Sequence, residues 1–115
     1  MVSDVDATLT ALADPTRRRI VELLRERPRR AGELVAAFDI SAPAVSRHLR
    51  VLRHSGVVTE RPADTDARQR IYELRPDRLA ALGAWLDQVQ SFWTDQLGAF
   101  KAHAEKTRAE RVSEE

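Results

Sequence analysis

Apolar residues recur at helical spacing near the start of the chain, in stripes that are separated by turn signals. The first stripe predicts a helix over about residues 4–13. The pair Asp14-Pro15 starts a second helix, because aspartate caps free N–H groups and proline fits the first helical turn. Pro28 ends that helix, because the residue before a proline avoids the helical region. A shorter third helix is expected over 31–38.

A fourth helix is expected within the stretch SAPAVSRHLRVLRHSGVV, residues 41–58. Ser41 is a typical N-cap, and Gly56 is a typical left-handed cap at the other end. Between these caps one face is apolar and is assigned to the core, and the opposite face carries serine and arginine. No Asp or Glu occurs anywhere in this stretch, so the polar face lacks the mixed charges of an ordinary solvated helix. The apolar face consists of Val45, Leu49 and Leu52.

Two strands and a long helix are expected in the second half. Residues 57–61 and 70–74 alternate and contain β-branched side chains, which predicts a β-hairpin with the polar tip PADTDARQ. Pro76 begins the last helix, expected over about 77–106, with apolar residues close to heptad spacing. Residues 107–115 are charged and are expected to form a frayed tail.

This order of elements predicts a fold that is mainly α with a small β-hairpin. A short helix, a tight turn, a capped second helix and a two-stranded hairpin form a winged helix-turn-helix. The chain has 115 residues, which is the usual size of one domain, so a single domain over residues 1–115 is expected.

Charge is distributed unevenly along the chain, although the net charge is only +1. Residues 17–70 hold 13 arginines against 7 acidic residues, whereas 1–16 and 71–115 are both negative. The planar guanidinium of arginine binds phosphate or guanine through paired hydrogen bonds, so the middle segment indicates a basic surface for a polyanion. A coding bias toward arginine explains the choice over lysine but not the segregation.

Composition and motifs exclude several classes of protein. The absence of cysteine excludes disulfides, thiol redox sensing and thiolate metal sites. No apolar run approaches the roughly 18 residues of a membrane span, and the acidic start lacks the pattern of a signal peptide. A soluble cytoplasmic protein without membrane contact is therefore the default. An enzyme is not expected, because there is no phosphate loop, metal triad or nucleophile–base set, and no such set is formed by the three histidines, His48, His54 and His103.

Three motifs in fixed order resemble the ArsR-type family of bacterial repressors. They are ALADPTRRRIVELL, then ELVAAFDISAPAVSRHLRVLRHSGVV, then RQRIY. The resemblance covers about residues 9–100. It implies a homodimer paired through the first and last helices, which binds a double-stranded DNA operator that is expected to be palindromic. It also implies that helix 42–55 enters the major groove and that the wing, 57–74, touches flanking backbone. An (auto)repressor is the function that follows.

The resemblance also places DNA contacts by position. Arg47 has the reach for a bidentate contact to guanine, and Ser46 suits a base edge or a phosphate. The arginines further along the helix and on the wing suit phosphates. Two apolar residues at the helix tip can touch a thymine methyl but cannot hydrogen-bond a base, so base readout must depend on Ser46 and Arg47. The full set of expected DNA contacts is Ala42, Pro43, Ser46, Arg47, Arg50, Arg53, Arg68 and Arg70.

The dimer interface implied by the resemblance is apolar and rich in aromatic residues, which usually pack at this spacing. One alternative for the aromatic cluster is a pocket for a small hydrophobic effector between the subunits. Another is that no ligand exists and the protein's own concentration sets control; the effector stays unknown. The expected interface residues are Val5, Leu9, Leu82, Trp85, Leu86, Val89, Phe92, Trp93 and Phe100.

Metal sensing, known in relatives, is not expected here, and neither is any other cofactor. Val35 and Ala37 stand where one kind of relative carries its cysteine pair. Asp87 and His103 match ligand positions of a second kind, but Val89 and Phe100 replace the intervening histidines. The ligands that remain are too few for a closed zinc site.

Two further basic features stay open at this stage. His48, beside the apolar stripe, is expected to pack or hydrogen-bond internally, with contact to DNA as the alternative. Arg17, Arg18 and Arg19 form either a solvated helix start or a set of phosphate contacts. A non-specific architectural DNA-binding protein is the alternative to a regulator, and the two differ in their preference for an operator over random duplex.

Overall fold

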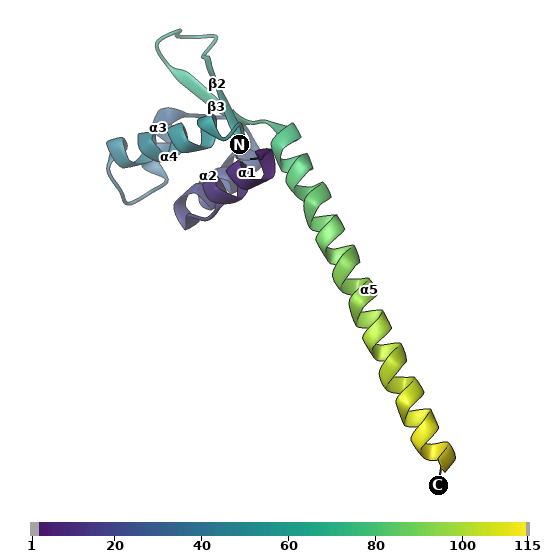
Figure 1. Ribbon diagram of the computed structural model, residues 1–115. Coiled ribbons are helices and arrows are strands. Elements are labelled where there is room, and N and C mark those ends of the chain that lie inside the picture. The colour runs from purple at the N-terminus through teal and green to yellow at the C-terminus, as the bar shows by residue number, and fades with distance from the viewer. Residues whose placement is uncertain (1–2, 115) are drawn as a thin grey trace. The chain divides into compact units, whose positions relative to one another are not determined.

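The computed structural model describes residues 3–114 (Figure 1). They divide into two compact units, with the boundary between Leu82 and Gly83. The second unit consists of helix alone. The expectation of a single domain stays a prediction. The elements, in chain order, are α1 (Asp4–Leu12), α2 (Pro15–Glu26), β1 (Arg29–Arg30), α3 (Ala31–Ala36), α4 (Ala42–His54), β2 (Val58–Pro62), β3 (Arg70–Leu74) and α5 (Pro76–Glu114).

The sheet of the first unit has three antiparallel strands in the order β1-β3-β2. β2 and β3 form the expected hairpin, with Glu60 opposite Tyr72, and in Figure 1 they extend beyond the helices as a ribbon. The short strand β1 pairs with the other edge of β3, with Arg30 opposite Ile71. The sequence did not reveal β1, because two residues are too short to show the period of a strand.

The core of the first unit is built from the apolar faces that helical spacing predicted. The stripe of α4 is buried, with Val45 and Leu52 fully inaccessible and Leu49 3% exposed. These side chains pack with residues of α2, α3 and β2, which also bury their apolar faces. The winged helix-turn-helix is therefore confirmed. The other core residues are Ala11, Ile20, Leu24, Leu34, Val57 and Val58.

Local capping determines where the helices begin and end. Asp14 Oδ1 accepts hydrogen bonds from the N–H groups of Thr16, at 2.8 Å, and Arg17, at 3.1 Å. Ser41 Oγ accepts one from the N–H of Ala44, at 3.2 Å, at the start of α4. Gly56 has φ +80°, which confirms the left-handed conformation expected after α4. The three predicted caps thus delimit α2 and α4.

Two helix ends differ from the sequence-based boundaries. α3 stops at Ala36 rather than at residue 38. α5 continues to Glu114, so the frayed tail expected from residue 107 is wrong over residues 107–114. The physical reason is composition, because arginine, alanine and glutamate favour helix even when no core is present. The last residue of the predicted tail, 115, lies outside the described residues. None of the helices within 3–114 is long and apolar enough to cross a membrane.

Candidate nucleic-acid interface

The polar face of α4 is exposed and free of internal partners. We define it as the residues opposite the buried stripe. Neither guanidinium on this face, Arg47 nor Arg50, forms an ion pair or a hydrogen bond within residues 3–114. No acidic residue lies anywhere on the helix. Unpaired arginines on an acid-free helix are suited to a negatively charged partner. The face consists of Ala42, Pro43, Ser46, Arg47, Arg50 and His54, all exposed.

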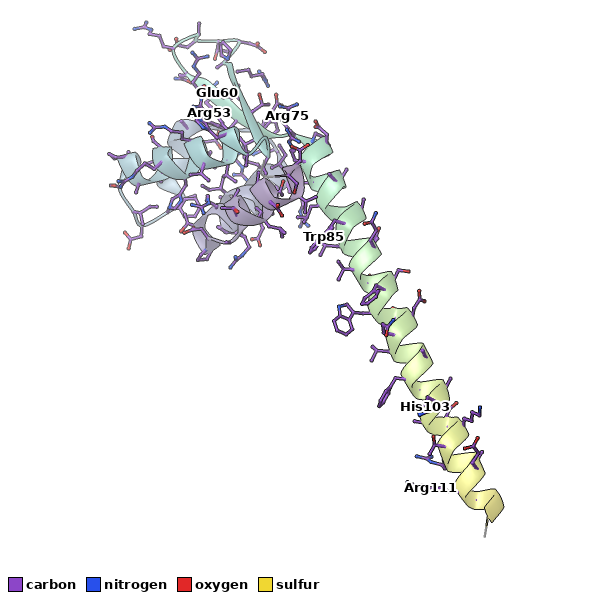
Figure 2. The ribbon with its side chains drawn as sticks, viewed as in Figure 1. Arg53, Glu60, Arg75, Trp85, His103 and Arg111 are labelled. Atoms are coloured by element: carbon purple, nitrogen blue, oxygen red, sulfur yellow. The ribbon has the colours of Figure 1, made fainter. Side chains whose placement is uncertain are left out.

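Arg53 lies in a different environment from these arginines. Its Nη1 donates to Glu60 Oε1 on β2, and both side chains are about one-third exposed or less (Figure 2). Burial raises the pKa of the neighbouring Tyr72, and the charge and hydrogen bond of Glu60 raise it further. Arg53 therefore ties the end of α4 to the wing, and its role as a phosphate contact stays a prediction. The sequence did not reveal Glu60 as its partner, because the pairing depends on how α4 packs against β2.

The wing arginines lie near the start of β3. The side chain of Arg68 is 95% exposed, and its backbone N–H donates to Asp66 Oδ1 at 3.0 Å. Its Nε is 3.7 Å from the same carboxylate, a weak pair in solvent. Arg70, the first residue of β3, is exposed. Both side chains have the exposure that a backbone contact requires, and their contact with DNA stays a prediction.

His48 forms the internal hydrogen bond expected from its position. Its Nδ1 lies 3.2 Å from Arg17 Nη1, within hydrogen-bonding distance. Asp14 Oδ1 is 4.0 Å from the same nitrogen. Burial alone would raise the pKa of Asp14, but the N–H of Arg17, the charge of His48 and the N–H of Thr16 together hold it below its usual value. The three side chains connect α2 to α4 behind the polar face.

The three arginines in the first turns of α2 are occupied by contacts within the chain. Arg17 donates through Nε to the carbonyl of Ala11 at 2.6 Å, and Arg18 donates through Nη1 to the carbonyl of Leu12 at 2.8 Å. Arg19 pairs with Glu22 at 3.2 Å in solvent. The first two arginines cap the C-terminal end of α1, where the helix dipole favours positive charge. They therefore stabilise the junction of α1 and α2, and contact of these arginines with phosphate stays an open alternative.

The residues expected at a dimer interface include a row of exposed apolar side chains on the second unit. Trp93 is 58% exposed and Phe100 is 73% exposed, and Phe92 and Trp93 meet edge to face at 6.0 Å. Leu97, 64% exposed, lies on the same stretch and was missed by the sequence analysis. Figure 2 shows Trp85 on the same helix. Of the nine predicted residues, those also exposed are Leu9, Trp85, Leu86 and Phe92, and those half-buried are Val5, Leu82 and Val89.

Asp87 and His103 do not come together within one chain. Both lie on α5, and 16 residues of helix separate them by about 24 Å along the axis. One ion therefore cannot bind both side chains of the same chain. Among residues 3–114 no cluster of three or more potential metal ligands occurs.

Comparisons with known proteins cover most of the chain. Residues 14–60 match the model of a family described as "Bacterial regulatory protein, arsR family". The HTH-type transcriptional regulator Rv2034 of Mycobacterium tuberculosis is 46% identical over 95 residues, 83% of each chain. The transcriptional repressor SdpR of Bacillus subtilis is 40% identical over 50 residues, 44% of this chain and 56% of its own length. The crystal structure of an ArsR family transcriptional regulator, 30% identical, covers 79% of this chain and 97% of its own, with a TM-score of 0.72.

Proposed function

Because the chain belongs to the ArsR family of bacterial regulatory proteins, we propose that it is a homodimeric repressor of its own operator. It is a DNA-binding transcriptional regulator and not an enzyme, and members of the family bind operators and typically act as dimers. In the proposed complex α4 enters the major groove and the wing follows the flanking backbone. A two-fold dimer would present two such helices to the two halves of a palindrome.

The observation that carries the proposal is the polar face of α4. Its two arginines have no internal partner within the described chain, whereas Arg17, Arg18 and Arg19 of α2 are held by carbonyls and a carboxylate. A guanidinium without a partner keeps all five of its N–H donors for a ligand. Arg47 is assigned to a guanine edge, Ser46 to a base edge or phosphate, and Arg50 to a phosphate.

The exposed apolar side chains of α5 support the dimer. Large exposed apolar patches on soluble proteins mark interaction sites, and aromatic residues are enriched in the buried centres of interfaces. We expect Trp93→Glu to place a charge in the interface and to convert the dimer to a monomer. Light scattering measures the mass directly, and Lys101→Glu, an exposed charge change on the same helix, is the control. A Trp93→Glu protein that remains dimeric would contradict this interface.

A fluorescence-anisotropy titration tests the function as a whole. The probe is DNA from upstream of the protein's own gene, with a scrambled duplex as competitor, at two salt concentrations. A regulator is expected to prefer the operator by about 10³-fold or more, with affinity that falls as salt rises. Equal affinity for both duplexes would contradict a sequence-specific repressor and favour an architectural role.

A further inference from the structure

A pocket of about 440 Å³ lies where the wing joins the rest of the first unit. β1 ends at Arg30, opposite Ile71, while β3 continues for one more residue, Arg70, beyond this last pair. Because the chain passes from β1 directly into α3, the pocket lies between the start of α3 and the start of β3. The pocket is lined from these two sides by residues 30–33 and 68–70, with Tyr72. Its volume is within the range of roughly 300–1,000 Å³ of small-ligand sites.

Arg30 bridges the two sides of this pocket. Its Nη1 donates to Gln69 Oε1, and its Nη2 donates to Thr65 Oγ1 at 3.2 Å. Both acceptors are neutral, so these bonds orient the guanidinium without balancing its charge. An anionic acceptor would add the attraction of opposite charges and paired geometry, which these neutral oxygens lack, so an incoming anion would compete well for the same donors.

Two further arginines, both on the wing, are among the residues that line the pocket. Arg70 forms no ion pair within residues 3–114. Arg68 faces Asp66 at 3.7 Å, but with 95% of its side chain exposed this pair is weak. Three arginines therefore line one concave surface with little internal compensation of their charge.

The acid in the lining, Glu33, does not cancel this charge. Its Oε2 accepts from Arg27 Nη2 at 2.6 Å, and its Oε1 accepts from the N–H of Arg30 at 3.3 Å. The hydrogen bond from Arg27 holds the pKa of Glu33 below its usual value, so the carboxylate stays ionised and paired with a cation that is not in the lining. The pocket as a whole thus retains a positive charge.

We propose that this pocket binds a phosphate group, held by the fork of Arg30 and enclosed by Arg68 and Arg70. The phosphate comes either from a free phosphorylated small molecule or from the backbone of bound DNA. Only the second source rests on the proposed function. A bound small molecule would occupy two arginines expected on the operator, so it would compete with DNA.

The first arm of the test uses the full chain without DNA. Phenyl phosphate is titrated at constant ionic strength, with chloride as the balancing anion, while NMR follows the amides of Gly32 and Gln69 in the lining. Saturating shifts are expected for the wild type and for Arg25→Gln, which removes an exposed arginine of α2 outside the pocket. Arg30→Gln is expected to bind at least about tenfold more weakly.

The second arm uses two operator duplexes that share a core and differ by a few flanking base pairs. If backbone phosphates fill the pocket, trimming weakens wild-type binding several-fold and leaves Arg30→Gln unchanged. The variant would also show a salt dependence less steep by about 0.9 in the log–log slope for each phosphate that it no longer neutralises. If a free phosphate compound is the ligand, trimming affects the two proteins equally and the NMR shifts saturate.

The pocket assignment is overturned if no saturating shift occurs and trimming affects the two proteins equally. Failure of the proposed function is a separate outcome. It would be seen in the anisotropy titration as a wild-type protein that binds operator and scrambled duplex equally well. In that case the NMR arm, which contains no DNA, still decides whether the pocket binds phosphate.

Discussion

The polar face of α4 and the first turn of α2 look alike in the sequence and differ in the structure. Each is a capped helix with a proline in its first turn and with closely spaced arginines. On α2 the guanidiniums of Arg17 and Arg18 donate to carbonyls at the end of α1. On α4 those of Arg47 and Arg50 have no partner within residues 3–114. The number of arginines is thus a poor guide to a binding surface, and the availability of their donors is a better one.

The cause of the difference is what precedes each helix. Only Ala13 and Asp14 separate α1 from α2, so the C-terminal carbonyls of α1 lie within reach of the first turn of α2. The positive charge of Arg17 and Arg18 opposes the dipole of their own helix but complements that of α1. Before α4 there is instead a turn of several residues after α3, and within residues 3–114 no helix end approaches its arginines closely enough to accept.

The largest expected effect is on stability and comes from Arg17→Ala. This change removes hydrogen bonds to Ala11 and to His48, and charged hydrogen bonds contribute about 1.5–3 kcal/mol each at partly buried sites. We expect a decrease of about 2–3 kcal/mol in the free energy of unfolding, measured by urea denaturation. Arg19→Ala, which removes only a solvent-exposed pair with Glu22, is the control and should cost less than about 1 kcal/mol. Equal decreases would contradict the distinction between an arginine held by carbonyls and one that is paired only in solvent.

Arg47→Ala is expected to leave stability unchanged and to weaken DNA binding. Its free energy of unfolding should stay within about 0.5 kcal/mol of the wild type, because the side chain is exposed and its guanidinium has no partner within residues 3–114. Operator binding should weaken by about 1–3 kcal/mol, with relaxed preference at one or two base pairs. Anisotropy titrations against single-base operator variants measure both quantities. Unchanged affinity and selectivity would show that a free guanidinium on this face is ordinary surface.

Much of this comparison was accessible from the sequence, and some was not. The caps Asp14 and Ser41 and the buried stripe of α4 depend on neighbours a few residues apart, so the sequence alone located them. The partners of Arg17 and Arg53 depend on how two elements meet in space, and no local pattern encodes such a contact. β1 was missed because it is two residues long.

The same reasoning applies to the candidate site. Exposure of Arg47 and Arg50 followed from their spacing against the apolar stripe, whereas the absence of partners within residues 3–114 required the structure. The pocket at Arg30 was not predictable, because it arises from residues about 35 positions apart that the β1–β3 pairing brings together.

Arg78 shows what happens when one nitrogen of a guanidinium is buried against backbone. Arg78 packs over Gly56, its Nη1 pairs with Asp4, and its Nε is buried without a partner among the described residues. A Cβ on Gly56 would lie 2.5 Å from that Nε, and φ +80° disfavours any side chain. Gly56→Ala should therefore cost about 1–2 kcal/mol of unfolding free energy. Gly32→Ala is the control, because a Cβ there has no atom within 4 Å, and thermal unfolding of both variants measures the contrast.

The smallest expected effect concerns pH and the occupied arginines of α2. The pKa of Asp14 is lowered in the folded protein: burial opposes the shift, but the N–H of Arg17 and the charge of His48 outweigh it. A lowered folded-state pKa stabilises the fold above the unfolded value of 3.8, and this stabilisation is lost as pH falls through the folded-state value.

Asp14→Asn keeps a capping oxygen but carries no charge. Its deficit in unfolding free energy relative to the wild type should therefore be largest at neutral pH and should shrink below about pH 4. Urea denaturation between pH 7 and about pH 3 follows this difference. Asp39→Asn, in the exposed turn before α4, should show no such convergence. A deficit for Asp14→Asn that stays constant with pH would mean that Arg17 and His48 are held by the geometry of the cap rather than by its charge.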